Sequence, residues 1–101
     1  MKLWIDDVRP APDGYMWCKS VRRTKELIEL IESTGAGNML ELIDLDHDAG
    51  DYAYDGGDYI RLLDWLEETG RDYPIHIHSA NPVGVANMRA IIQRNGWREV
   101  F

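Results

Sequence analysis

This sequence of 101 residues lacks several features that define common protein classes. Cysteine occurs once, as Cys18, so an internal disulfide is excluded. No apolar run approaches the roughly 20 residues of a membrane span, and the N-terminus has none of the marks of a secretory signal. Internal repeats and low-complexity tracts are absent. We therefore expect a single domain over residues 1–101, located in the cytoplasm and without membrane partners.

Basic residues are also scarce, with 11 Lys and Arg against 18 Asp and Glu, a net charge of −7. This balance opposes binding to the phosphate backbone of long duplex nucleic acid, but it leaves room for a nucleotide or a nucleic-acid end. Much of the acidity is local. Six aspartates crowd into one stretch: Asp44, Asp46, Asp48, Asp51, Asp55 and Asp58. Such a cluster either attracts a cation or forms a solvated loop, and for Asp51 and Asp58 we favour the loop.

The apolar pattern predicts strands that alternate with helices. The expected strands cover residues 2–6, 15–19, 39–46, 74–79 and 97–101, and the expected helices cover about 21–34, 58–69 and 82–95. The last helix has the clearest boundaries, because Asn81 is a capping residue, Pro82 suits the first helical position and Gly96 ends the pattern. The sequence thus predicts an α/β fold.

Right-handed crossovers between parallel strands should place the consecutive helices on one face of the sheet. In the strand at 74–79, Ile75 and Ile77 alternate with His76 and His78, which is typical of a strand covered on one side only. Four aromatic residues either cover the opposite face or make it a homodimer surface. They are Trp4, Trp17, Trp97 and Phe101.

Polar side chains follow three of the predicted strands at the point where each strand ends. They are Asp6 and Asp7, then Asp46 and His47, and then His78, Ser79 and Asn81. In an open parallel sheet, ligands bind outside the carboxyl ends of the strands, so we expect these side chains to converge on one site.

These residues resemble the pattern of a receiver domain, the phosphoacceptor module of two-component signalling. Asp6-Asp7 is similar to its acidic pair, Asp46 to its phosphoacceptor, Asp55-Gly56 to its Asp-Gly and Ser79 to its switch hydroxyl. Other stretches resemble more closely the compact relatives called cyclic-phosphate processing receiver-like domains. They are Asp6-Asp7-Val8-Arg9-Pro10, Leu45-Asp46-His47-Asp48, His78-Ser79-Ala80-Asn81-Pro82 and Val83-Gly84-Val85-Ala86-Asn87-Met88.

The resemblance implies a flavodoxin-like parallel sheet of about five strands in the order 2-1-3-4-5. It also implies that the helices lie mainly on one face and that the first and last receiver helices are missing. A receiver has a lysine on its fifth strand that pairs with the phosphoryl group, whereas residues 97–101 offer only Arg98. This departure argues against ordinary phosphorelay signalling.

Three carboxylates at adjacent strand ends repel one another unless a cation neutralises them or one takes up a proton. We predict that Asp6, Asp7 and Asp46 hold a divalent cation, Mg²⁺ or Mn²⁺. The alternative is that Asp7 pairs with Arg9 or caps a turn.

His47 and His78, together with Asp46, are the candidate catalytic residues. Opening a cyclic phosphodiester needs one proton removed from water and one delivered to the leaving oxygen, and two imidazoles can supply both transfers. The alternative for each histidine is a hydrogen-bonded structural role.

Ser79, Asn81 and Arg9 are the candidate phosphate ligands, because a hydroxyl, a helix start and a guanidinium all bind anions. Simple capping is the alternative for Asn81, and an ion pair is the alternative for Arg9. Tyr52 and Tyr54 either stack on a base or pack their own loop.

We therefore predict a phosphoesterase acting on cyclic phosphates, either 2′,3′-cyclic RNA ends or cyclic nucleotides. The first alternative is a degenerate receiver that accepts or senses phosphate at Asp46, or binds a protein partner, without hydrolysis. The second is an accessory protein that binds a cyclic nucleotide without turning it over.

Overall fold

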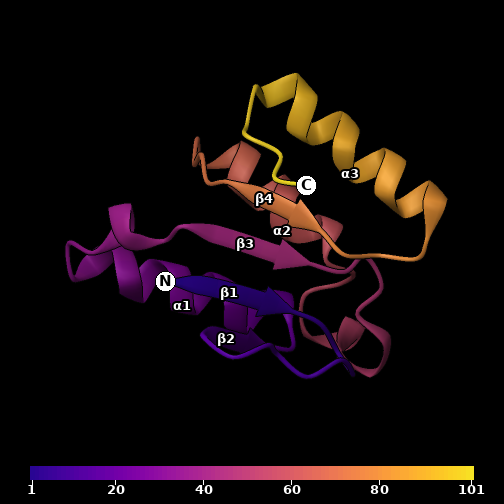
Figure 1. Cartoon of the computed structure of the whole chain (residues 1–101), viewed down its shortest axis with the longest axis horizontal. Helices are drawn as coiled ribbons and strands as arrows, with labels where there is room; N and C mark the ends of the chain where they lie inside the picture. Colours follow the sequence, from indigo (N-terminus) through magenta and orange to yellow (C-terminus); the bar gives the residue numbers. More distant parts are fainter.

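A computed structural model describes residues 1–101, which form a parallel sheet with helices packed against it (Figure 1). The strands are β1 (Lys2–Ile5), β2 (Tyr15–Cys18), β3 (Leu42–Leu45) and β4 (Ile75–Ile77). The helices are α1 (Val21–Ser33), α2 (Ile60–Glu68) and α3 (Pro82–Asn95), with short 3₁₀ helices η1 (Gly37–Met39) and η2 (Gly50–Asp55). The strand order is β2-β1-β3-β4, and all pairs are parallel.

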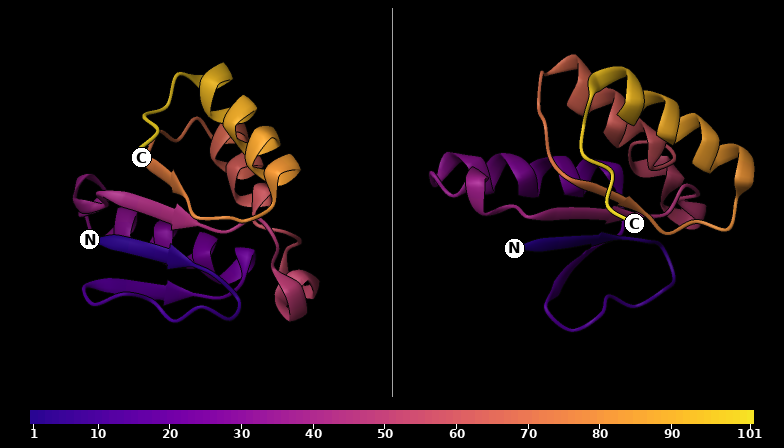
Figure 2. Two further views of the ribbon diagram at one scale, coloured as in Figure 1. Left: turned by 45° about the vertical axis from the view of Figure 1, so that its right-hand side comes forward. Right: turned by 45° about the horizontal axis from the view of Figure 1, so that its top comes forward.

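The arrangement confirms the predicted α/β fold and the receiver-like strand order. All three α-helices cover the same face of the sheet (Figure 2). Residues 6–14, between β1 and β2, contain no helix. The helix that joins the first two strands of a receiver is therefore missing, as the resemblance implied. None of the helices has the length and hydrophobicity needed to span a membrane.

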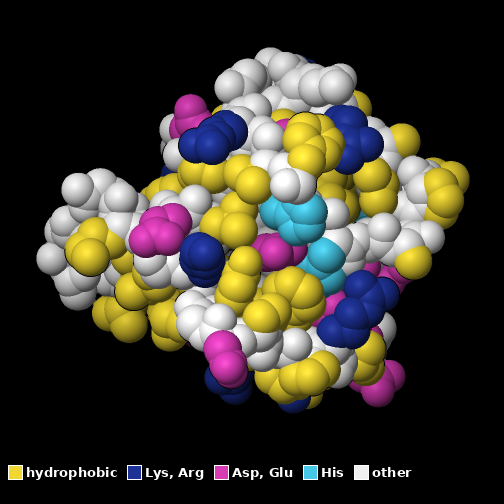
Figure 3. All heavy atoms as spheres, in the orientation of Figure 1, with side chains coloured by type: hydrophobic (Ala, Val, Ile, Leu, Met, Phe, Trp, Pro, Cys, Tyr) yellow, Lys and Arg dark blue, Asp and Glu magenta, His cyan; other side chains and the backbone are white.

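Strand alternation sorts the side chains between two faces. Ile5, Ile43 and Ile75 are fully buried in the hydrophobic cluster beneath the helices. The opposite, helix-free face bears Trp4, Asp44 and His76, which lie in register across β1, β3 and β4. Figure 3 views this face and shows histidine side chains at its centre, next to acidic and hydrophobic ones.

The predicted fifth strand is wrong. Residues 97–101 make only one bridge to β4, in which Ile75 donates to the carbonyl of Arg98 at 2.9 Å and accepts from Val100 at 2.7 Å. The side chain of Glu99 is held by Arg89 of α3, with N–O distances down to 2.6 Å. Since β4 itself has three residues, no longer ladder forms and the sheet has four strands.

Three other expectations also need correction. Trp97 does not cover the helix-free face, because its side chain is buried in the core cluster, while Phe101 remains 88% exposed. The strand expected at 39–46 is shorter, because residues 37–39 form η1. Part of the stretch expected as an acidic loop forms η2.

The start of α1 is fixed by the side chain of Ser20. The Ser20 hydroxyl accepts from the N–H of Arg23 at 3.2 Å and donates to Asp55 of η2 at 2.8 Å. Arg22 also donates to Asp55, at 2.7 Å. The pKa of Asp55 lies below its ordinary value because of the hydrogen bonds from Arg22 and Ser20. One buried hydroxyl thus joins the helix to the segment that precedes α2.

We expect Ser20→Ala to lower the free energy of unfolding by about 2 kcal/mol, because the helix loses its cap and Asp55 loses a donor. Urea unfolding followed by circular dichroism measures the change. The control is Ser33→Ala at the exposed end of α1, which should change stability by less than about 0.5 kcal/mol. Equal effects of the two substitutions would contradict the proposed role of Ser20.

Candidate metal and phosphate site

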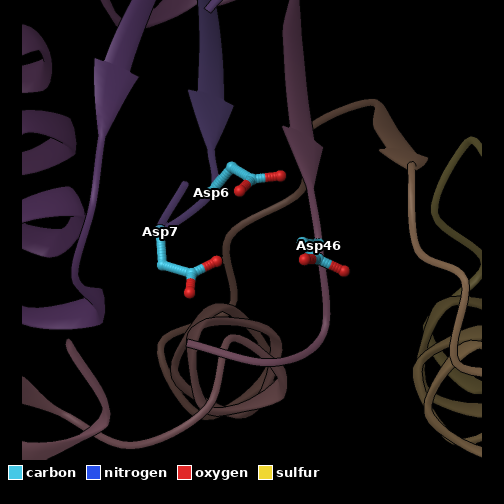
Figure 4. Close-up of side chains that lie close together, drawn as sticks. All are labelled: Asp6, Asp7 and Asp46. Atoms are coloured by element: carbon cyan, nitrogen blue, oxygen red, sulfur yellow. The ribbon is translucent and has the colours of Figure 1, made fainter. Parts of the chain in front are cut away.

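Three aspartates meet at the carboxyl edge of the sheet. Asp6 follows β1 and Asp46 follows β3, while Asp7 is one residue further along (Figure 4). The N–H of Asp6 donates to Cys18 and that of Asp46 donates to Ile5, so both backbones continue the strand ladder. One carboxylate oxygen from each aspartate lies within 4.8 Å of the others. We call these three residues the carboxylate cluster.

The cluster is unusually sheltered for acidic residues. Asp6 is 0% exposed, Asp46 is 8% exposed and Asp7 is half-buried. Burial raises the pKa of Asp6, but hydrogen bonds from Arg9, Val8 and His78 lower it, leaving its pKa below the ordinary value. The pKa of Asp7 is raised, chiefly by burial and also by the charges of Asp6 and Asp46. Negative charge is therefore concentrated where water is partly excluded.

Gly50 fixes one side of the cluster. Its φ of +54° lies in the left-handed region, and a Cβ at this position would overlap the carboxylate of Asp7. The first residue of η2 thus packs directly against Asp7. Only glycine leaves room for that carboxylate.

The donor set fits a hard divalent cation. Carboxylate oxygens at this spacing are the ligands that Mg²⁺ and Mn²⁺ prefer. The nearest cationic side chain is that of Arg9, whose Nη1 lies 4.0 Å from Asp6 Oδ2. Asp7 and Asp46 form no ion pair, so their charges have no partner within the chain. We conclude that Asp6, Asp7 and Asp46 could hold such an ion.

His78 lies beside the cluster, on the helix-free face. Its Nε2 is 2.9 Å from Asp6 Oδ2, and its Nδ1 is 2.5 Å from Asp44 Oδ1. The ring stacks on Trp4 with a centroid separation of 3.7 Å and an interplanar angle of 3°. Both ring nitrogens are therefore occupied by buried carboxylates. Such contacts hold a side chain in place, and proton transfer by His78 would require one of them to open.

Asp44 and Trp4 are the site residues that sequence analysis missed. Both lie within strands, whereas the predicted site residues lie at strand ends. The available signal was the acidic residue between Ile43 and Leu45, whose alternation places Asp44 on the helix-free face.

His47 belongs to a different group of contacts, at the start of α3. Its Nδ1 is 2.8 Å from Asp48 and 3.5 Å from the amide nitrogen of Asn81. A Cβ at Gly84 would overlap the imidazole ring, so this glycine allows the helix to approach it. The Nε2 atom of His47 has no hydrogen-bond partner. No hydrogen bond joins His47 to His78.

The candidate phosphate ligands form local structure at the same edge. Asn81 caps α3 by accepting from the N–H of Gly84 at 3.0 Å, and its amide is 3.4 Å from Asp48. The Ser79 hydroxyl accepts from the N–H of Asn81 at 3.2 Å. Arg9 donates to the carbonyl of His78 at 3.0 Å, while half of its side chain stays exposed. Arg9 thus joins the loop after β1 to the end of β4.

One comparison with known proteins gives a match. The family model described as cyclic-phosphate processing receiver domain matches residues 1–94. No curated protein and no solved structure gives a significant match. The match covers the whole sheet, the carboxylate cluster and nearly all of α3.

We expect Asp7→Asn to raise the melting temperature of the metal-free protein by roughly 3 °C, because like-charge repulsion in the cluster falls. In the wild type, Mg²⁺ or Mn²⁺ at about 100-fold its Kd should stabilise the fold by roughly 2.7 kcal/mol. Asp7→Asn should abolish this stabilisation. Thermal melts with EDTA, Mg²⁺ and Mn²⁺ measure both effects.

The matched control is Asp51→Asn, which removes an exposed charge from η2 and should retain the response to metal. A destabilised Asp7→Asn protein that still responds to metal would contradict the assignment of the cluster.

Proposed function

We propose that this chain is a phosphoesterase that opens cyclic phosphates. It belongs to the family of cyclic-phosphate processing receiver domains, whose model matches residues 1–94. The observation that supports this most is the carboxylate cluster, with one oxygen each from Asp6, Asp7 and Asp46 within 4.8 Å. A bound divalent cation would polarise a phosphoryl oxygen and neutralise charge that develops there. The three aspartates would hold that ion at the carboxyl edge of the sheet.

The reaction adds water to the phosphorus of a five-membered cyclic phosphodiester. One water–phosphorus bond forms, one ribose oxygen–phosphorus bond breaks, and the proton lost by water is balanced by the proton gained by the ribose oxygen. His47 is the residue that we assign to proton transfer. Its Nε2 is free and its Nδ1 faces Asp48, which orients the ring.

We assign His78 a positioning role instead, although sequence analysis expected it to transfer protons. It connects the buried carboxylates of Asp6 and Asp44, and it is stacked on Trp4. A histidine in this position holds Asp6 in one orientation toward the cluster. Ser79, Arg9 and the start of α3 at Asn81 would orient the phosphate oxygens.

The test is a timed assay on an RNA oligonucleotide with a 2′,3′-cyclic phosphate end and on 2′,3′-cyclic mononucleotides, with Mg²⁺, Mn²⁺ or EDTA. We expect metal-dependent formation of one monoester, whose identity shows which P–O bond breaks. Absence of turnover on both substrates under every metal condition would contradict the proposed activity.

Substitution of the histidines separates their roles. We expect His47→Gln to lower kcat by 10²-fold or more while the metal-induced rise in melting temperature is unchanged. His78→Gln should weaken both turnover and the metal response, because Asp6 loses its partner. His76→Gln is the control, because the hydrogen bond of this ring is with the carbonyl of Val100 and not with the cluster, so the variant should retain activity.

Loss of stability in His78→Gln is itself expected, because the buried carboxylate of Asp44 would lose its hydrogen bond with His78 and that of Asp6 would keep only the N–H groups of Val8 and Arg9. The double variant Asp44→Asn/His78→Gln removes one of those charges and should recover part of the stability. An active, metal-responsive His78→Gln protein would show that His78 does not position Asp6.

A phosphate-accepting receiver is the second candidate function. Asp46 follows β3, and Ser79 lies two residues beyond the end of β4, which is the receiver arrangement of phosphoacceptor and switch hydroxyl. The only cationic residue in 97–101, Arg98, is exposed. If this function is correct, beryllofluoride will bind with Mg²⁺ and Asp46→Asn will abolish binding. Absence of beryllofluoride binding, with turnover of cyclic phosphates, would exclude it.

A further inference from the structure

A pocket of about 490 Å³ opens at the edge of the sheet formed by β2. It lies between the edge strand β2, the first half of α1 and η2, and we call it the aromatic pocket. Its lining residues are Trp17, Cys18, Lys19, Arg23, Leu27 and Tyr52. Figure 2 shows η2 beyond the carboxyl ends of β1 and β2, where it forms one wall. A volume of this size is in the range of small-molecule sites.

The charge of the pocket is opposite to that of the chain. Lys19 and Arg23 line it, no acidic residue does, and neither cation forms an ion pair. The chain has a net charge of −7, but two cations without an ion-pair partner in one pocket attract an anion there. The net charge at the same time disfavours a long polyanion.

The aromatic residues of the pocket are arranged around one cation. Lys19 Nζ lies 4.4 Å from the ring centre of Trp17 and 5.8 Å from that of Tyr52. Trp17 is 39% exposed and Tyr52 is half-buried. Lys19 lies over one face of Trp17, and partly exposed aromatic rings beside a cation are surfaces on which nucleobases stack. Leu27 adds an apolar surface below them.

Two contacts join this pocket to the carboxylate cluster. The indole nitrogen of Trp17 donates to the backbone carbonyl of Asp6 at 2.8 Å. In η2, Gly50 packs against the carboxylate of Asp7, and Tyr52, which lines the pocket, donates its N–H to the carbonyl of Ala49 at 2.9 Å. The aromatic pocket and the carboxylate cluster therefore share Trp17 and η2 as neighbours.

We propose that the aromatic pocket binds the nucleobase of a nucleotide whose phosphate lies at the carboxylate cluster. This inference rests on the proposed function and names its substrate class: a nucleotide or the terminal nucleotide of RNA, not a base-free cyclic phosphate. Tyr52 and Trp17 stack on the base, and the positive charges of Lys19 and Arg23 attract the negatively charged nucleotide. Tyr54, the other tyrosine of η2, is 83% exposed and outside the pocket.

Calorimetry with Mg²⁺ tests binding directly, using adenosine 3′-monophosphate, inorganic phosphate and a trinucleotide that ends in adenosine 3′-phosphate. We expect the mononucleotide to bind at least about tenfold more tightly than phosphate. Tyr52→Ala should weaken it by about fivefold or more, the usual contribution of one base–aromatic stack. Arg23→Gln should weaken it with a smaller salt dependence than the wild type.

The matched controls are Tyr54→Ala and Arg98→Gln, which remove an exposed tyrosine and an exposed cation outside the pocket and should bind as the wild type does. Equal affinity for the trinucleotide identifies an RNA end as a ligand, and exclusion of the trinucleotide identifies a free nucleotide. Either result supports nucleotide binding in the aromatic pocket. Wild-type affinity in Tyr52→Ala and Arg23→Gln would overturn it.

The turnover assay distinguishes failure of this inference from failure of the proposed function. Turnover of 2′,3′-cyclic AMP with an unchanged KM in Tyr52→Ala would overturn the pocket and leave the phosphoesterase intact. Binding that depends on Tyr52, with no turnover of any cyclic phosphate, would support the pocket and overturn the enzyme.

Discussion

The rest of the structure depends on the burial of one charged residue, Asp6. Its carboxylate is 0% exposed, and one of its oxygens accepts the N–H groups of Val8 and Arg9 at 3.0 and 2.9 Å. The other oxygen contacts His78 at 2.9 Å. A buried carboxylate is tolerated only when its hydrogen-bonding capacity is filled, so the loop after β1 and the end of β4 are both held in place by the same side chain.

This constraint explains why the helix-free face is polar at its centre. Asp44 and His78 lie on the face of the sheet that no helix covers, where side chains are ordinarily open to solvent. They contact each other there, and Trp4 stacks on the imidazole of His78. The arrangement connects three strands, from Trp4 in β1 through Asp44 in β3 to the end of β4. Side chains of the helix-free face thus hold Asp6 of the carboxylate cluster in place, much as hydrogen-bond partners orient the ligands of a metal site.

Local signals in the sequence predicted the boundaries of α3 and the carboxylate cluster, but they did not predict the contacts of His78. The boundaries of α3 followed from Asn81 and Gly96, and the carboxylate cluster followed from aspartates at strand ends, because each signal lies within a few neighbouring residues. The contacts of His78 with Asp44 and Asp6 depend on strand register across segments 34 and 72 residues apart, which no local pattern encodes. The fifth strand failed for the same reason, since its pairing was limited by the short β4.

The cationic residues around the carboxylate cluster lie at other positions than those of a signalling receiver. There, a lysine on the fifth strand meets the phosphoryl group, whereas here residues 97–101 form no strand and Arg98 is exposed. The unpaired cations Lys19 and Arg23 lie instead beyond β2, at the opposite edge of the sheet from β4. We propose that Arg9, beside Asp6, meets the phosphate, while Lys19 and Arg23 attract the rest of the ligand toward the aromatic pocket. That asymmetry favours a ligand that extends past its phosphate over a lone phosphoryl group.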